Sequence, residues 1–137
     1  MPTKTDIFLD TNVLLYALDK GSPYHTSASS LLKNPNLNFF VTTKVISEYF
    51  AVCSKLGVLL SDAFVLYRSV SQNAKILFPG NSSLAIFEQL LQKYQPKGNR
   101  VFDLEIVSVA VANQIPEIAT VNLKDFSGIT EITVRPL

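Results

Sequence analysis

A few carboxylate side chains stand in this sequence where a ligand or a metal ion could bind. Asp10 directly follows the apolar run of residues 7–9, which is too short for a helix and is typical of a strand buried on both faces of a parallel sheet. Open α/β sheets bind their ligands at the carboxyl ends of their strands. Asp10 is therefore a candidate functional residue, although it could equally serve only as the cap of a helix expected over residues 11–18.

A second acid, Glu48, lies within a helix expected over residues 44–56 and capped by Thr42 or Thr43. The apolar residues of this helix recur at steps of three and four, at Val45, Tyr49, Val52 and Leu56. Glu48 falls on or beside the buried stripe that they form. Because a buried charge is costly unless it is paired or coordinated, we expect Glu48 to have either a basic partner or a metal ion.

The third acid, Asp103, lies near the start of an apolar helix expected over residues 101–113. An acid at a helix N-terminus is favourable by about 0.3–1 kcal/mol without any further role, so its position alone leaves a structural role open. Glu105 projects about 200° away from Asp103 on the helical wheel and is a lesser candidate.

The last part of the chain repeats the opening pattern. An apolar strand expected over residues 118–121 leads to Asn122, which is placed as Asp10 is placed after the first strand. Asp125 follows within one helical turn, and residues 131–134 are expected to form a closing strand.

Strands and helices alternate between these sites. Further helices are expected over residues 23–33, from a cap at Ser61 to residue 70, and over residues 81–94, and further strands over residues 37–41 and 75–78. This alternation predicts an α/β fold. With 137 residues and 47% hydrophobic content, the chain suits a single domain spanning residues 1–137.

Composition and charge exclude several classes of protein. One Cys and one His rule out a disulfide framework and an ordinary Cys/His zinc site. No apolar stretch resembles a signal peptide or a membrane span, so we expect a cytoplasmic protein with no membrane partner. The net charge of +1 means that any contact with nucleic acid must come from a local basic cluster. Lys97 and Arg100, in the basic connection of residues 93–100, are the candidates, although this connection could also be a solvated turn.

The ordered set of motifs resembles the PIN domain, and specifically the VapC-type toxin ribonucleases of bacterial toxin–antitoxin pairs. The resemblance rests on Leu-Asp-Thr-Asn-Val-Leu at residues 9–14, the Ser47-Glu48 pair, Asp103 at the head of a late helix, and Ala-Thr-Val-Asn-Leu-Lys-Asp-Phe at residues 119–126. It implies that Asp10, Glu48 and Asp103 bind metal. It also matches Asn122 to a fourth catalytic position that is acidic in some members and Asn in others, where Asp125 could replace part of the missing charge.

By this resemblance the protein is a metal-dependent endoribonuclease with a mainly parallel central sheet flanked by helices on both faces. Three converging carboxylates would repel one another unless a cation neutralised them, and ligands that are all oxygen suit Mg²⁺ or Mn²⁺. Thr11 and Asn12 would hydrogen-bond these carboxylates or a bound water. Two rival families fit poorly: a haloacid-dehalogenase phosphatase needs an acid at the position of Asn12, and a response-regulator receiver needs an adjacent acidic pair. The open alternative is a non-catalytic PIN-like scaffold that binds RNA or protein.

The same resemblance implies a homodimer, an RNA substrate and an antitoxin partner. The chain has 9 Phe and 5 Tyr residues, more than one core layer needs. We therefore expect an antitoxin peptide to lie along the helices near Tyr16, Phe50, Phe64 and Tyr67, although each of these side chains could instead pack wholly inside.

Overall fold

The computed structural model describes residues 3–137, so residues 1–2 of the expected domain lie outside the described residues. A five-stranded sheet in the order β3-β2-β1-β4-β5 forms its centre, and every neighbouring pair of strands is parallel. The strands are β1 (Thr5–Leu9), β2 (Leu37–Thr42), β3 (Ala74–Leu77), β4 (Glu117–Thr120) and β5 (Thr133–Pro136). The helices are α1 (Thr11–Leu18), α2 (His25–Leu32), α3 (Thr43–Lys55), α4 (Leu60–Ser71), α5 (Asn81–Tyr94), α6 (Arg100–Ala112) and the 3-10 helix η1 (Leu123–Phe126).

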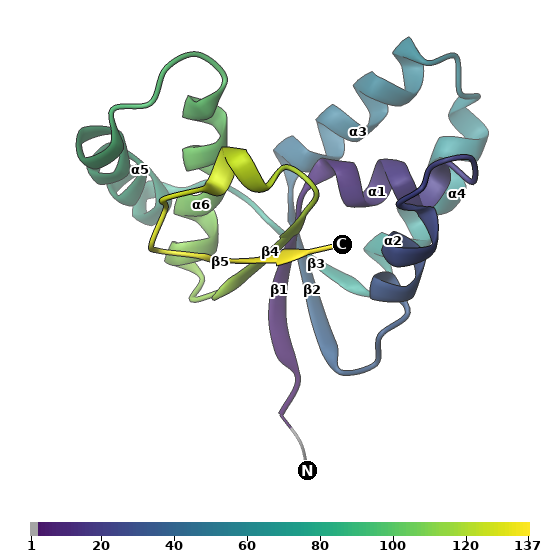
Figure 1. Cartoon of the computed structure of the whole chain (residues 1–137), viewed down its shortest axis with the longest axis horizontal. Helices are drawn as coiled ribbons and strands as arrows, with labels where there is room; N and C mark the ends of the chain where they lie inside the picture. The colour runs from purple at the N-terminus through teal and green to yellow at the C-terminus, as the bar shows by residue number, and fades with distance from the viewer. Residues whose placement is uncertain (1–2) are drawn as a thin grey trace.

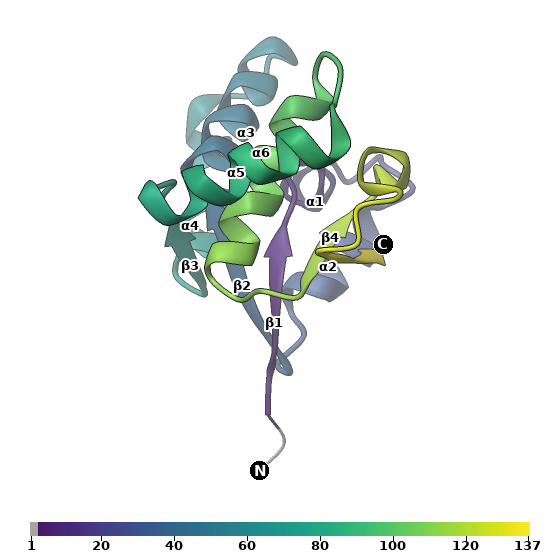
Figure 2. The same ribbon diagram turned by 90° about the vertical axis from the view of Figure 1, so that its left-hand side faces the viewer.

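The helices form two groups on opposite sides of the sheet. Figure 1 shows α1, α2 and α4 on one side and α5 and α6 on the other, and Figure 2 shows α5 and α6 packed together in front of the strands. Helix α3 follows β2 directly and extends beyond the carboxyl end of the sheet. The expected α/β fold with a parallel sheet covered on both faces is therefore confirmed. None of the helices within residues 3–137 is long and apolar enough to cross a bilayer.

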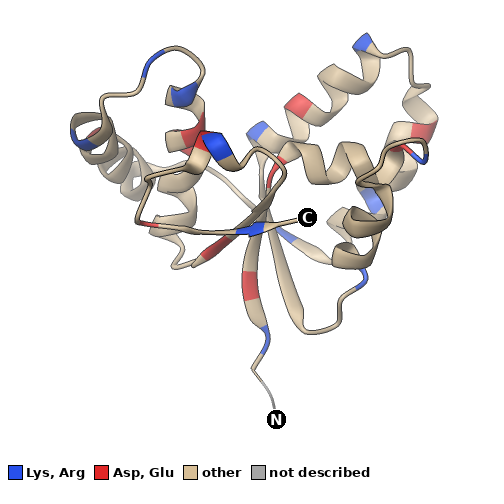
Figure 3. Cartoon of the chain, in the orientation of Figure 1, with Lys and Arg blue, Asp and Glu red and all other residues tan. Residues whose placement is uncertain are grey.

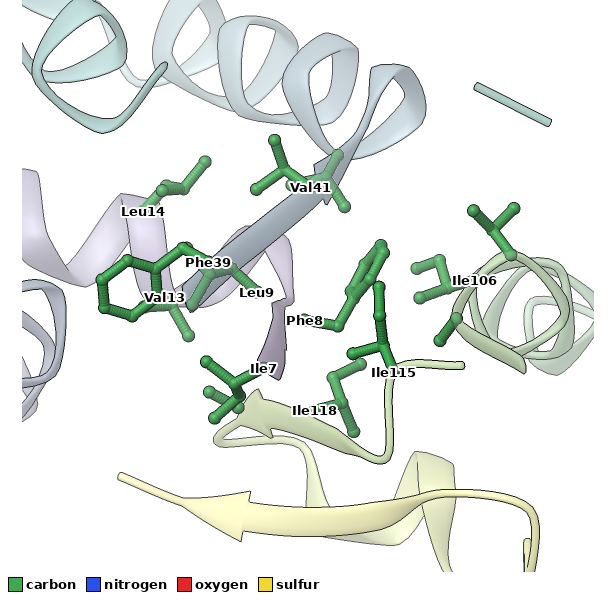
Figure 4. Packing of buried hydrophobic residues seen from close by; sticks show 14 of the residues in the cluster. Ile7, Phe8, Leu9, Val13, Leu14, Phe39, Val41, Ile106, Ile115 and Ile118 are labelled. Carbon is green, nitrogen blue, oxygen red and sulfur yellow. The ribbon is translucent and has the colours of Figure 1, made fainter. Parts of the chain in front are cut away.

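The core is built around β1, whose residues Ile7, Phe8 and Leu9 are fully buried. Successive side chains of a strand point to opposite faces. Figure 4 accordingly shows Phe8 beside Ile106 of α6, whereas Phe39 of β2 lies on the α1 side. Burial on both faces explains why the sequence of β1 is apolar without alternation.

The order of the strands reverses beside β1. After β1 the chain builds β2 and β3 on one side of it and then crosses to build β4 and β5 on the other. The carboxyl ends of β1 and β4 therefore flank a topological switch point, which is where open α/β sheets bind ligands. The backbone N–H of Asp10 donates to the carbonyl of Ala119 at 3.1 Å, so the segments that follow both strands begin side by side.

Some element boundaries differ from the expected ones. Thr42 caps α3 as expected, accepting from the backbone N–H of Val45 at 3.2 Å. Helix α4, however, has Leu59 at its N-cap with no side-chain cap, so Ser61 is not the cap. Strand β5 begins at Thr133 and not at residue 131, because the carboxylate of Glu131 is bound by Lys93 and Tyr94 of α5.

Candidate metal centre

Asp10 is held by three hydrogen bonds at the end of β1. The backbone N–H of Thr11 donates to its Oδ1 at 2.8 Å, and the Thr120 hydroxyl and the Asn12 amide donate to its Oδ2 at 2.8 and 3.1 Å. Asp10 is also the N-cap of α1. The capping role and a functional role are therefore compatible, and the side chain is only 8% exposed.

Thr120, at the end of β4, is the residue that organises this arrangement. Its hydroxyl donates to Asp10 and accepts from the Asn12 side chain at 3.1 Å and from the backbone N–H of Asn122 at 3.0 Å. A hydroxyl has one donor and two acceptor lone pairs, so Thr120 is fully satisfied. The side-chain carbonyl of Asn12 in turn accepts a hydrogen bond from the backbone N–H of Val121 at 3.2 Å. Thr120 was not among the residues predicted from the sequence, although a hydroxyl residue just before the segment of Asn122 was a visible signal.

Burial and a neighbouring charge both act on Asp10. Burial raises the pKa of Asp10 above its ordinary value, the hydrogen bonds from Thr120 and Thr11 oppose this rise, and the charge of Glu48 adds to it. Hydrogen bonds to the ionised form favour it. The contacts with Thr120, Thr11 and Asn12 thus support a carboxylate at a place where burial disfavours one.

Glu48 lies beside the buried stripe of α3 and not within it, since its side chain is 43% exposed. Its Oε2 accepts from the Thr11 hydroxyl at 2.9 Å. Its Oε1 lies 3.7 Å from the ammonium of Lys44, one helical turn earlier. Of the two partners expected for Glu48, a basic side chain or a metal ion, the structure shows the basic side chain of Lys44. Thr11 also links Glu48 to Asp10, because its backbone N–H donates to the Asp10 carboxylate.

Asp103 is in the first turn of α6, as expected, and is half-buried. Burial raises the pKa of Asp103 to about 6, and the charges of Asp125, Asp10 and Glu48 add to the rise, whereas Arg100 opposes it. The charges of all the other proposed acids thus act on Asp103. Figure 3 shows acidic segments on α3, on α6 and between β1 and α1 at the carboxyl end of the sheet, with basic segments at the same end.

The acids are near one another without forming a metal cage. Among residues 3–137, no three Asp, Glu, His or Cys side chains come close enough together to hold an ion. The full convergence expected from the sequence is not seen in this conformation. Asp10 and Glu48 each have other hydrogen-bonding or charged partners.

The donor set nevertheless fits a hard divalent cation. Asp10, Glu48 and Asp103 offer only oxygen ligands, as Mg²⁺ and Mn²⁺ prefer. Burial is the main cause of the raised pKa of Asp103, and a cation would offset the smaller part that comes from the neighbouring acids. Asn122 is exposed and precedes η1, and Asp125 lies within η1, where its charge acts on Asp103.

The two basic candidates also lie at this end of the molecule. Lys97 and Arg100 are both exposed, and Arg100 is the first residue of α6, three residues before Asp103. Its charge lowers the pKa of Asp103. These positions leave both side chains accessible to a phosphate.

The family model of the PIN domain matches residues 7–130, and the chain therefore belongs to the PIN domain family. The family resemblance seen in the sequence motifs is thereby confirmed. A comparison with curated proteins finds no match.

Solved structures with the same fold include several toxin–antitoxin proteins. VapBC2 from Rickettsia felis, solved bound to a DNA fragment from its promoter, has a TM-score of 0.73 at 22% identity, covering 97% of this chain and 99% of that one. VapC20 of Mycobacterium tuberculosis, described as a toxin that cleaves the sarcin–ricin loop, has a TM-score of 0.69 at 17% identity, with 93% and 98% covered. VapBC-1 from nontypeable Haemophilus influenzae has a TM-score of 0.68 at 20% identity, with 96% and 98% covered. At these identities the likeness is one of fold.

Proposed function

We propose that this PIN domain is a metal-dependent endoribonuclease and the toxin of a toxin–antitoxin pair. The observation that carries the proposal is the carboxylate of Asp10, held by Thr11, Asn12 and Thr120 at the switch point of the sheet. Burial is the main cause of the raised pKa of both Asp10 and Asp103; the charge of Glu48 adds to the rise at Asp10, and the charge of Asp10 adds to the rise at Asp103. In a scaffold that only bound RNA, Asp10 would serve only as the N-cap of α1.

Each residue has a definite role in this proposal. Asp10, Glu48 and Asp103 would hold the cation, with Asn122 and Asp125 beside it. The chemistry that a bound Mg²⁺ or Mn²⁺ supplies is activation of water and stabilisation of the charge that develops on the phosphodiester. Thr120 and Asn12 keep Asp10 oriented and favour its ionised form, and Thr11 orients Glu48 by a hydrogen bond.

The test is cleavage of single-stranded or looped RNA by the purified protein. We expect cleavage with Mg²⁺ or Mn²⁺, no cleavage with EDTA, and loss of about 10²-fold or more in the rate on Asp10→Asn. Glu88→Gln, which removes a charge from an exposed position of α5, should cleave at the wild-type rate. Cleavage that persists unchanged in EDTA would refute the metal mechanism. RNA binding without any cleavage in metal would support the scaffold alternative.

We also propose an antitoxin partner, supported by the similarity to solved VapBC complexes. An open groove of about 1020 Å³ lies between α1, α3 and α4, and Asn12 is one of the residues that line it. Its lining is mainly apolar and consists of Leu15, Tyr16, Leu18, Val52, Cys53, Leu56, Val58 and Val65, with Asp19, Lys20, Gly21 and Asp62. An amphipathic helix could bury its apolar face here.

The groove overlaps only part of the surface expected from the sequence, and the place where an antitoxin binds stays a prediction. Tyr16 lines it, but Phe50, Phe64 and Tyr67 do not. These three are half-buried and pack on one another, with Phe50 lying 4.8 Å from Phe64 and 5.3 Å from Tyr67 between ring centroids. The exposed apolar side chains at the groove are instead Leu56 and Val65, at 73% and 71%.

A homodimer, which the VapC resemblance implies, stays a prediction. Sedimentation equilibrium of the purified protein measures it directly.

A further inference from the structure

One basic side chain lies beside a proposed metal ligand, Glu48, and has no part in the function proposed so far. Lys44, in the first turn of α3, is only 22% exposed. Its ammonium lies 3.7 Å from Glu48 Oε1 and also 3.7 Å from Glu105 Oε2 of α6. It also lies 3.3 Å from the ring centroid of Phe102. Lys44 therefore joins α3 to α6 across the carboxyl end of the sheet.

The distances show that Lys44 is shared between the two carboxylates. Both are longer than an N–H···O hydrogen bond, which spans roughly 2.7–3.2 Å, so neither acid holds the ammonium in a fixed bonding geometry. Glu105 and the Phe102 ring together could keep the charge in place without Glu48, since an ammonium over an aromatic face is attracted to it. Lys44 can thus release Glu48 without being left unpaired.

Glu48 is also a proposed ligand of the divalent cation, and this further step rests on that proposed function. We propose that Lys44 is an internal counterion that pairs with Glu48 in the metal-free protein and withdraws to Glu105 and Phe102 when a divalent cation binds. The ammonium and the cation compete for one carboxylate. Lys44 is then a positioning residue that weakens metal binding, and Glu105 is the group that receives it.

Metal affinity is the measurement that tests this competition. It can be obtained for Mn²⁺ and Mg²⁺ by calorimetric titration and from the rise of the melting temperature with metal concentration, without any activity assay. Lys44→Met keeps the apolar stem and removes the charge, and we expect it to bind the cation about fivefold more tightly. Lys44→Gln should show the same change. Lys124→Met is the matched control, because Lys124 lies in η1 at the same end of the sheet and forms no ion pair within residues 3–137. This substitution should change the metal affinity by less than about twofold.

A double-mutant cycle separates competition from the general effect of charge. Glu105→Gln should weaken metal binding about threefold in the wild type, because Lys44 then depends more on Glu48, and should have little effect in the Lys44→Met background. Additive effects of the two substitutions would overturn the proposal. So would equal metal affinity in the wild type and Lys44→Met, which would leave the metal centre itself intact. If the cation binds none of these folded variants, the metal centre and the role of Lys44 both fail.

Discussion

Replacing Asp103 by Asn should stabilise the metal-free protein at neutral pH. Asp103 is half-buried and lies close enough to Asp125, Asp10 and Glu48 for their charges to act on it. Burial and these charges raise its pKa from 3.8 to about 6. A carboxyl group whose pKa is raised by folding binds its proton more tightly in the folded state. Its contribution to stability is therefore complete below about pH 4 and is lost as the pH rises to about 6 and above.

The size of the effect follows from this shift. Each unit of pKa corresponds to about 1.4 kcal/mol, so a rise of roughly two units sets an upper bound of about 3 kcal/mol. Water reaches this half-buried carboxyl, which reduces the expected gain to about 1–2 kcal/mol at a pH of about 7.5. For a chain of this length the melting temperature should rise by about 3–6 °C.

Thermal melts of the wild type and Asp103→Asn in EDTA, between about pH 4 and pH 8, measure this directly. The two curves should meet at the acidic end of this range and separate with rising pH. Asp62→Asn is the matched control, because Asp62 is also the acid in the first turn of its helix but is exposed. It should lose up to about 1 kcal/mol through the helix dipole. If Asp103→Asn lowers the melting temperature at neutral pH as Asp62→Asn does, then the ionised carboxylate of Asp103 does not destabilise the protein through burial and repulsion by the other acids.

Added Mg²⁺ or Mn²⁺ should reverse the order. The wild type should gain stability from the cation, whereas Asp103→Asn, which lacks one proposed ligand, should gain little. A metal-induced rise of equal size in both proteins would remove Asp103 from the ligand set.

Three further results are expected. Thr120→Val should destabilise the fold by about 1.5–3 kcal/mol and slow RNA cleavage, since it removes the hydroxyl that donates to buried Asp10. Thr120→Ser, which keeps a hydroxyl, should restore the stability and the cleavage rate. A Val variant as active as the wild type would show that this hydrogen bond is dispensable. The double variant Lys97→Ala/Arg100→Ala should bind single-stranded RNA with a weaker salt dependence. The slope of log affinity against log salt concentration should fall in magnitude by about 1.4, as the loss of two phosphate contacts requires. An unchanged slope would indicate that this connection is only a solvated turn. Val65→Glu should weaken antitoxin binding at least about tenfold without changing the cleavage rate, because the side chain is 71% exposed at the groove; full inhibition of this variant by antitoxin would place the partner elsewhere.

Local patterns in the sequence were sufficient for the elements that carry the acids. Residues 7–9 and the polar joint that follows them predict a buried strand, a cap and a helix, and β1, Asp10 and α1 are found there. Asp103 is in the first turn of α6 for the same reason. These features depend on hydrophobic periodicity and capping within about ten residues, which a linear sequence shows directly.

Besides the local error at the cap of α4, the boundary that was wrong was decided by distant partners. The start of β5 depends on its pairing with β4 and on the capture of Glu131 by α5, about 37 residues earlier in the chain. The exposure of side chains on α3 and α4 likewise depends on how these helices meet. The aromatic residues Phe50, Phe64 and Tyr67 pack together, and Leu56 and Val65 are left at the surface.

The organisation of the site itself was decided only by the tertiary structure. Thr120 donates to Asp10 across 110 positions of sequence, and Lys44 lies between Glu48 and Glu105, which belong to different helices. The first contact exists because β4 pairs with β1, and the second because the Lys44 side chain at the start of α3 reaches Glu105 and Phe102 of α6. The sequence by itself determined which residues are candidates for binding a cation. The order of the strands, which no local periodicity encodes, determined which hydrogen bonds and charges hold those residues in place.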